Sequence, residues 1–464
     1  MKRLFIMLLV FLLFFGCTQK EAKPPAPPPI TYLTFTDGTI VFQYPKWPDM
    51  PPQQGMFLAK NNLSCFFTAA SYPLPPSFFE QLLKANSQSF SSDGKYADYT
   101  IGIGEQAFKG RSRLIYCDYK TYAISIACVN TKPDAGMLSS ATCKKRQLNT
   151  KPKLGLIANP PNNDITKFTE TIRDARTNGV DVLYWYFSWA DLADNWTVSD
   201  ILMPMLSHEG RTAIVMEAIH TNTLGRYPSK YTSFDQPGFK EDYAAFSVAF
   251  VKRYHPDYYF LGNEVDDYFY THREQLPAFK ELLRYTREKI KQESPTTKVG
   301  FTATYHDAIK NNDTDIIQNL AEDADIIGYT DYGAHDLFVF DNVSRGIEYL
   351  DGPKTIVPGK PYAIVEAGWS TSAVLNSSED KQADYARGFF AYLNNTDAEF
   401  VNWFNLHDDT DCSAVAGTFL TESPQLKGDA EFLGIFKEFL CNFGLKKADG
   451  TPKKAWQVWQ ENTA

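Results

Sequence analysis

The chain has 464 residues, of which 44% are apolar and 15% aromatic, so it can bury a large core and is not an intrinsically disordered protein. Its formal net charge is -9 and no stripe of Lys and Arg runs along it. We therefore expect no nucleic-acid partner.

The first thirty residues have the pattern of an export signal. Lys2 and Arg3 precede an apolar run that ends before Cys17, and this run is shorter than the roughly 20 residues that span a bilayer. The stretch LFFGC resembles a lipoprotein signal. That resemblance implies a signal peptide over 1–16, a lipid on Cys17, and a protein anchored to the cell membrane on its extracytoplasmic side. An ordinary signal peptide is the alternative. The Pro-rich segment 17–30 is predicted to be a semi-rigid tether.

Six cysteines follow Cys17, an even number in a chain predicted to be exported. We expect two disulfides within residues 65–143 and a third between Cys412 and Cys441. The sequence contains no CxxC or HExxH pattern, so we predict no metal site and no cofactor.

Residues 31–148 predict a small antiparallel α+β domain. Short runs such as ITYLTF and YAISIACV alternate apolar and polar residues, and one helix is expected at SFFEQLLKANSQSF, residues 77–90. The opening FTDGTIVFQYPKWP resembles the start of the PsbP-like fold. This resemblance carries no catalytic residues, so it implies a spacer or a binding module.

From about residue 153 to 460 the pattern changes to strand-like runs that alternate with amphipathic helical runs. Eight strands are predicted at 153–160, 180–189, 211–220, 257–264, 298–305, 324–333, 360–369 and 398–407. Helices are predicted between them, among others at 165–179, 239–254, 276–293 and 379–395. This alternation is typical of a (β/α)8 barrel, a TIM barrel of the α/β class. An open doubly wound sheet is the alternative, but no Gly-rich phosphate fingerprint follows the first strand.

Two of the predicted strands end in a carboxylate. Asn263 and Glu264 follow the fourth strand, and Glu366 ends the seventh. Strands four and seven lie across a barrel from each other, and active sites lie at the carboxyl ends of barrel strands. Two carboxylates that flank one cleft suit glycosidic bond cleavage.

These motifs, GNEV and EAGWS, resemble those of the clan-A glycoside hydrolases, which are retaining (β/α)8 enzymes. The two motifs are most similar to those of endo-β-1,4-galactanases and endo-β-1,3-glucanases, although the glucanases have ETGWPS where this chain has EAGWST. The closing segment GLKKADGTPKKAWQVWQ is also similar to the end of such barrels.

The resemblance implies roles for single residues. Glu264 would be the acid/base, Glu366 the nucleophile, and Asn263 the partner of the sugar 2-hydroxyl. Tyr329 is expected beside the nucleophile in preference to Tyr332. Trp403, at the end of the last strand, would form the floor of the sugar subsite.

Further substrate contacts are expected from side chains near the other strand ends. Trp185, Trp189 and Trp369 would extend the aromatic platform, with core packing as the alternative for each. His220 is expected to touch a sugar hydroxyl, with a structural role as the alternative. Asp266 and Asp267 either bind substrate or solvate their loop.

The sequence thus predicts a membrane-anchored glycoside hydrolase that cleaves a β-linked polysaccharide or oligosaccharide with retention of configuration. We expect a carbohydrate substrate and a monomer. The alternative is a non-catalytic surface lipoprotein that binds glycans. The presence of both carboxylates and of Asn263 favours the enzyme.

Overall fold

The structure, a computed structural model, describes the chain in segments. These are 32–36, 40–45, 56–60, 65–72, 76–93, 95–103, 106–117, 120–129, 136–143, 153–334, 338–340, 342–410, 412 and 430–463. The chain forms two compact units, Met1–Arg146 and Gln147–Ala464. The predicted signal peptide, Cys17 and the tether lie outside the described residues. Among the residues described, no helix combines the length and apolar character needed to cross a membrane.

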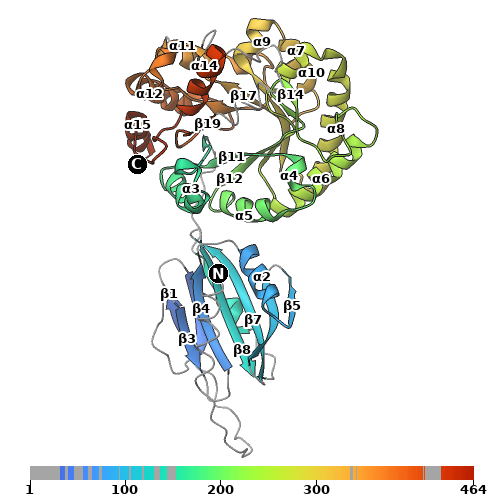
Figure 1. The fold of residues 1–464 in the computed structure, drawn as a ribbon, viewed down its shortest axis with the longest axis vertical. Helices are drawn as coiled ribbons and strands as arrows, with labels where there is room; N and C mark the ends of the chain where they lie inside the picture. The colour runs from blue at the N-terminus through green and yellow to red at the C-terminus, as the bar shows by residue number, and fades with distance from the viewer. Residues whose placement is uncertain are drawn as a thin grey trace, which may run out of the picture. The chain divides into compact units, whose positions relative to one another are not determined.

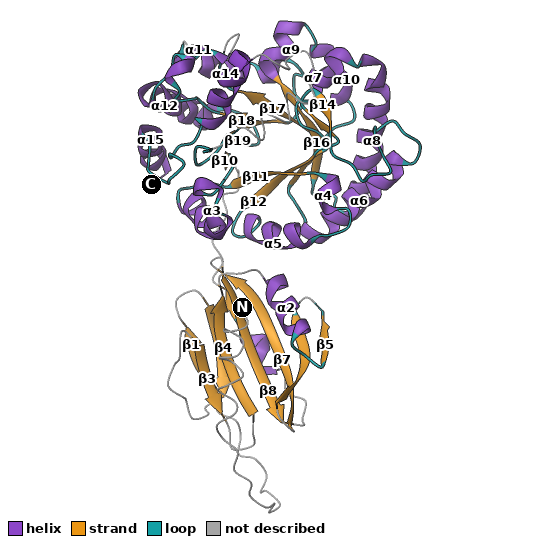
Figure 2. Ribbon diagram, in the orientation of Figure 1, coloured by secondary structure: helices purple, strands orange, loops and turns teal. Residues whose placement is uncertain are grey.

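The N-terminal unit is built on a six-stranded antiparallel sheet (Figures 1 and 2). In spatial order its strands are β3 (Met56–Lys60), β4 (Cys65–Tyr72), β8 (Lys120–Val129), β7 (Gln106–Cys117), β6 (Tyr96–Ile103) and β5 (Ser89–Ser92). A smaller sheet contains β1 (Tyr32–Thr36), β2 (Ile40–Pro45) and β9 (Thr142–Cys143). The predicted α+β class is therefore confirmed for this unit.

The single long helix predicted at 77–90 is shorter than expected. Helix α2 (Pro76–Ala85) ends early, and the serine-rich continuation forms β5, which pairs with β6. Serine side chains compete for backbone hydrogen bonds and do not favour a helix interior, so the sheet edge takes this segment.

Cysteine pairing follows the strand register where the structure describes it. Cys65 and Cys128 lie opposite each other on β4 and β8 and form a disulfide. Cys412 and Cys441 form another, as predicted. The side chains of Cys117 and Cys143, which the second disulfide predicted within 65–143 would need, lie outside the described residues.

The C-terminal unit is a closed barrel of eight parallel strands. The strands are β10 (Leu154–Leu156), β11 (Val182–Phe187), β12 (Arg211–Met216), β15 (Tyr258–Phe260), β16 (Lys298–Thr304), β17 (Ile326–Asp331), β18 (Tyr362–Ala367) and β19 (Val401–Trp403). Each pairs with the next, and β19 pairs with β10. The (β/α)8 prediction is confirmed, and the open-sheet alternative is wrong.

Helices surround the barrel (Figure 2). They include α3 (Phe168–Thr177), α5 (Thr197–Leu206), α6 (Phe239–Tyr254), α8 (Leu276–Glu293), α10 (Thr314–Ala321), α11 (Val343–Asp351), α12 (Glu379–Asn395) and α15 (Lys454–Thr463). Three shorter elements follow strand ends, namely α4 (Trp189–Leu192), α7 (Val265–Thr271) and α9 (Tyr305–Asn311), and α14 (Ala430–Cys441) comes after β19. The four helices expected from sequence periodicity correspond to α3, α6, α8 and α12.

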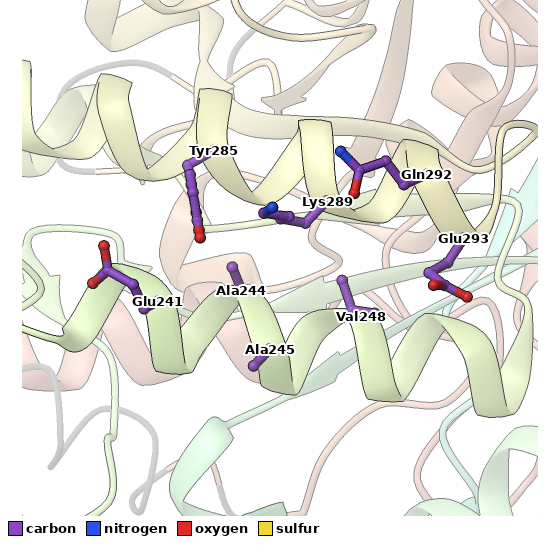
Figure 3. A pocket seen from close by; sticks show the side chains of 8 residues that line it. All are labelled: Glu241, Ala244, Ala245, Val248, Tyr285, Lys289, Gln292 and Glu293. Atoms are coloured by element: carbon purple, nitrogen blue, oxygen red, sulfur yellow. The ribbon is translucent and has the colours of Figure 1, made fainter.

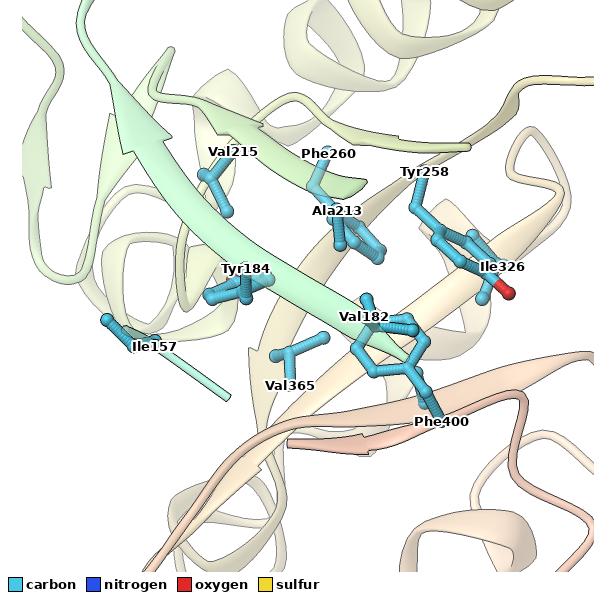
Figure 4. Packing of buried hydrophobic residues seen from close by; sticks show 11 residues of the cluster. Ile157, Val182, Tyr184, Ala213, Val215, Tyr258, Phe260, Ile326, Val365 and Phe400 are labelled. Atoms are coloured by element: carbon cyan, nitrogen blue, oxygen red, sulfur yellow. The ribbon is translucent and has the colours of Figure 1, made fainter. Parts of the chain in front are cut away.

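The barrel interior is a packed apolar core (Figure 4). Its members alternate along the strands, as Val182 and Tyr184 do on β11 and Ala213 and Val215 do on β12. Successive side chains of a strand point to opposite faces, so the intervening residues face the helix layer. This alternation decides which residues near the strand ends reach the mouth of the barrel.

Three of the four tryptophans expected to stack on sugar are instead core residues. Trp403 is 0% exposed and packs against Tyr385, Phe389 and Trp459 in the helix layer. Trp369 is also fully buried, with its indole N–H bonded to Ser377. Trp189 is buried among four aromatic rings, those of Tyr231, Phe239, Tyr243 and Phe246. A ring without an exposed face cannot stack on a sugar, which corrects the prediction for these residues.

Trp185 makes an edge contact with Phe168 of α3 at a centroid distance of 5.2 Å. Trp185 is only partly buried and also packs against the interior barrel cluster. The sugar contact expected of this residue stays a prediction.

Replacing Trp403 tests its assignment to the core. Trp403→Ala is expected to lower the free energy of unfolding by about 3 to 5 kcal/mol, because it opens a cavity between β19 and two helices. Val374, which is 67% exposed, provides the control. Val374→Ala should change that free energy by less than about 0.5 kcal/mol in the same urea titration. A stable Trp403→Ala protein with impaired sugar binding would contradict the core assignment and indicate that Trp403 contacts the sugar.

Candidate active site

The two predicted carboxylates come together at the mouth of the barrel. Glu264 lies just beyond the end of β15 and Glu366 lies near the end of β18. Because all eight strands are parallel, both ends open on the same side. The charge of Glu264 raises the pKa of Glu366, so the two carboxylates lie close enough to repel each other.

Glu264 is held in a left-handed backbone conformation, with φ 48° and ψ 49°. Its N–H donates to Thr302 Oγ1 at 2.8 Å. Its carboxylate accepts from two hydroxyls, Thr221 Oγ1 to Oε2 at 2.9 Å and Thr330 Oγ1 to Oε1 at 2.7 Å. Burial raises the pKa of this carboxyl, and the two hydroxyls oppose that effect.

Asn263 is 5% exposed and is fixed through both its backbone and its side chain. Its N–H donates to Ile219 O and its carbonyl accepts from Thr221 N, which ties the end of β15 to the small hairpin of β13 (Ile219–His220) and β14 (Thr223–Leu224). Its side-chain Oδ1 accepts from Thr302 Oγ1 at 2.9 Å. The predicted Asn263 and Glu264 thus share one partner, Thr302.

Glu366 is 4% exposed and accepts hydrogen bonds from two phenols. Tyr186 OH donates to Oε1 and Tyr332 OH donates to Oε2. Burial raises the pKa of Glu366 to about 8, the charge of Glu264 adds to this rise, and the two phenols counteract it. With a pKa of about 8 for Glu366, the two neighbouring carboxyls hold a proton between them at neutral pH.

The tyrosine beside Glu366 is Tyr332, so the preference for Tyr329 was wrong. Tyr329 is 1% exposed, and its hydroxyl forms no hydrogen bond with a described residue. Thr330, its neighbour on β17, reaches Glu264 instead. A register irregularity lies between Tyr329 and Thr330 in the pairing with β18. Thr330 and Tyr332 share the parity of Ile326 in the barrel interior, whereas Tyr329 has the opposite parity, so strand alternation favours Tyr332.

His220 lies at the mouth with its side chain 43% exposed. Its Nδ1 lies 2.7 Å from Glu217 Oε1. Burial lowers the pKa of the imidazole, but the hydrogen bond and charge of Glu217 outweigh burial and raise that pKa to about 9. His220, which was predicted to contact the substrate, is therefore a cation at neutral pH. Its charge lowers the pKa of both Glu264 and Glu366.

Phe404 lies toward the barrel interior, unlike its neighbour Trp403. It is the next residue along the chain and packs against the interior barrel cluster. Its ring lies edge-on to Tyr332 at 5.4 Å and to Phe443 at 5.7 Å. Phe439 of α14 also contacts Tyr332. An aromatic wall of the partly buried Tyr332 and Phe404 therefore stands beside Glu366, and the buried Phe439 and Phe443 pack against Tyr332.

Asp266 and Asp267 lie in the first turn of α7, which begins directly after Glu264. Asp266 is 2% exposed and accepts from Thr304 N at 2.9 Å and Thr304 Oγ1 at 2.6 Å, so it fastens α7 to β16. Burial raises its pKa to about 7. Asp266 is thus a structural residue, which corrects both roles predicted for it. Burial and the charge of Asp266 raise the pKa of Asp267 well above its usual range.

Sequence reasoning missed five polar side chains of the site, namely Tyr186, Glu217, Thr221, Thr302 and Thr330. For Tyr186 a signal was available, because it is the last residue on its strand that shares the parity of Val182 and Tyr184. The threonines carry no such signal, since threonine is common in strands of any function.

Two further observations concern other possible binding sites among the described residues. No group of three His, Cys, Asp or Glu side chains among them is placed to hold a metal ion. A groove of 230 Å³ lies on the outer surface between α6 and α8, lined by Ala244, Ala245, Val248, Tyr285, Lys289 and three other residues (Figure 3). Neither Glu264 nor Glu366 lines this groove.

Comparisons with known proteins place the fold but not a family. No protein-family model and no curated protein matches the chain. Among solved structures, an exo-β-1,4-mannosidase from an Opitutaceae bacterium is 14% identical, with a TM-score of 0.50 over 68% of this chain and 62% of the mannosidase. The match therefore spans less than two thirds of that enzyme.

Two other solved structures match with lower TM-scores. A xylanase from Thermotoga maritima is 14% identical, with a TM-score of 0.47 over 68% of this chain and 95% of the xylanase. A family 39 glycoside hydrolase from Bacteroides cellulosilyticus is 14% identical, with a TM-score of 0.44 over 80% of this chain and 78% of that one. At such low identity the likeness to the mannosidase establishes the (β/α)8 fold, and the chemistry has to be argued from the site.

Proposed function

We propose that the chain is a retaining glycoside hydrolase that cleaves β-linked glycans. The observation that carries this proposal is the pairing of two carboxylates at the barrel mouth, the partly buried Glu264 and the buried Glu366, each with its own set of hydroxyl donors. The names of structural neighbours, among them a mannosidase and a xylanase, support the same class of reaction.

In the proposed mechanism Glu366 attacks the anomeric carbon while Glu264 protonates the departing oxygen. The two phenols on Glu366 stabilise its ionised form, as a nucleophile requires. The mechanism therefore requires the proton shared by the pair to reside on Glu264 when the substrate is bound. In the second step Glu264 accepts a proton from water, which attacks the glycosyl-enzyme and releases the sugar.

The cellular setting is proposed from the sequence. The apolar run before Cys17 supports an exported lipoprotein that acts on the extracytoplasmic side of the cell membrane. The aromatic wall beside Glu366 supports a sugar ring as the ligand, because apolar faces of a pyranose pack on such rings. A monomer is proposed as well.

The competing hypothesis is a surface protein that binds glycans without cleaving them. The donors on both carboxylates favour the enzyme, because a pure binding site has no need to bury two repelling acids at a cost in stability.

Removal of either carboxylate tests the chemistry. Glu264→Ala and Glu366→Ala are each expected to lower kcat/KM on a β-linked oligosaccharide, whose leaving oxygen needs protonation, by at least about 10³-fold, since each removes a reacting group. Glu170, whose side chain is 73% exposed, supplies the matched control, and Glu170→Gln should leave the rate unchanged. Wild-type protein that hydrolyses no member of a broad glycan panel would favour the binding protein.

Stereochemistry tests the retaining assignment. Proton NMR of the first product formed should show the β-anomer, because two displacements restore the starting configuration. A crystal structure should show carboxyl groups about 5 to 5.5 Å apart. An α-anomer as first product would contradict the glycosyl-enzyme.

The two tyrosines of the β17 region form a matched pair of variants. Tyr332→Phe is expected to lower kcat/KM by about tenfold to hundredfold, because losing the phenol raises the pKa of Glu366 and weakens its ionised form. Tyr329→Phe removes a hydroxyl that has no partner among the described residues and should leave kcat/KM nearly unchanged. Equal losses in the two variants would contradict the placement of Tyr332.

The pH dependence of kcat/KM follows from the shared proton. The rate should fall on the basic side near pH 8, where the carboxyl pair loses its last proton, since burial and like charge raise the pKa of Glu366 to about 8. It should fall on the acidic side when both carboxyls are protonated. With a dinitrophenyl leaving group, which needs no acid, Glu264→Gln should remove the basic limb. A basic limb that persists in this variant would assign it to another group.

A further inference from the structure

The hydroxyl of Thr302 connects the two residues that follow β15. Its Oγ1 donates to Asn263 Oδ1 at 2.9 Å and accepts from Glu264 N–H at 2.8 Å. A hydroxyl has one proton, so a single orientation satisfies both contacts. Thr302 is 0% exposed, which shields this arrangement from water.

This contact decides which way the Asn263 amide faces. An amide has one acceptor oxygen and an NH₂ group with two donors. Thr302 holds the oxygen, and the NH₂ group donates to none of the described residues. Its two protons are therefore left for a ligand at the mouth of the barrel.

The Thr302 side chain is itself locked in place. Threonine is branched at Cβ and has few χ1 rotamers in a strand. Thr302 pairs with Gly328 of β17, and a Cβ on Gly328 would lie 3.0 Å from the Thr302 methyl carbon. Gly328 thus leaves the space that the methyl group of Thr302 fills.

The same hydroxyl supports the backbone of Glu264. A residue with a side chain pays a cost for a φ of 48°, and such a conformation persists only where its surroundings hold it. The bond from Glu264 N–H to Thr302 Oγ1 is one such restraint.

We propose that Thr302 is a positioning residue for glycoside cleavage, whose hydroxyl turns the Asn263 NH₂ group toward the sugar 2-hydroxyl. This inference rests on the proposed function, in which Asn263 contacts that hydroxyl. Thr302 touches no reacting atom and acts through Asn263 and the backbone of Glu264.

Thr330 provides a matched comparison on the neighbouring strand. Its hydroxyl donates to the carboxylate of Glu264 at 2.7 Å and lowers the pKa of that group. Thr302 and Thr330 therefore lie in the same site and permit the same substitution. Loss of the Thr302 hydroxyl is expected to disturb recognition of the sugar 2-hydroxyl. Loss of the Thr330 hydroxyl is expected to disturb the protonation of Glu264.

The experiment compares Thr302→Val, Thr302→Ser and Thr330→Val on an aryl β-glycoside that the wild type cleaves and on its 2-deoxy analogue. The readout is the ratio of kcat/KM for the two substrates. Thr302→Val should lower this ratio about tenfold, and Thr302→Ser should restore it to within about threefold of wild type. Asn263→Ala should lower the ratio of kcat/KM values by the same factor as Thr302→Val. The double variant that combines the two substitutions should show no larger loss than either single variant.

Thr330→Val should leave the ratio unchanged and move the basic limb of the pH profile to higher pH, because it removes a hydroxyl that lowers the pKa of Glu264. A ratio that is unchanged in Thr302→Val, whatever happens to the rate itself, would overturn the proposal. A wild type that cleaves no glycoside would overturn the proposed function instead.

Crystal structures give a readout that does not depend on activity. In Thr302→Val the Asn263 side chain should leave its wild-type rotamer, while in Thr330→Val it should stay. An Asn263 side chain in the same position in wild type and Thr302→Val would overturn the positioning role.

Discussion

Pairing of β19 with β10 is the constraint on which the site depends. It closes eight parallel strands into a barrel, so that the ends of β15 and β18 open on one side. Glu264 and Glu366, 102 positions apart in the chain, become neighbours only through this closure. An open sheet with the same strands would leave the two carboxylates on separate parts of an edge.

Closure also creates an electrostatic cost. Loss of hydration raises the pKa of both acids, and the charge of Glu264 raises the pKa of Glu366 further. Three sets of groups offset this cost. Two threonines donate to Glu264, two phenols donate to Glu366, and the protonated imidazole of His220, which Glu217 stabilises, supplies a positive charge. The balance keeps one proton in the pair, which is the state that acid-assisted glycoside cleavage needs.

Strand parity separates the residues that face the cleft from those that face the helices. Trp403 and Phe404 are adjacent, yet the first packs on Phe389 and Trp459 while the second packs on the barrel interior beside Tyr332. Tyr329 and Thr330 divide in the same way, with only Thr330 reaching Glu264. A shift of one residue therefore separates a structural residue from one that serves the site.

The sequence by itself determined the eight strands, the principal helices and the two carboxylates, because hydrophobic periodicity and a charge after an apolar run are local signals. It also indicated Asn263 and His220. Only the tertiary structure decided which aromatic residues serve the site. A tryptophan that could stack on a sugar has the same local pattern as one that fills the core. The register shift between β17 and β18, which places Glu366 opposite Thr330, is likewise a property of the assembled sheet. The partners of Glu264 and Asn263 come from β16, β17 and the hairpin after β12, and contacts of such long range appear only once the barrel has closed.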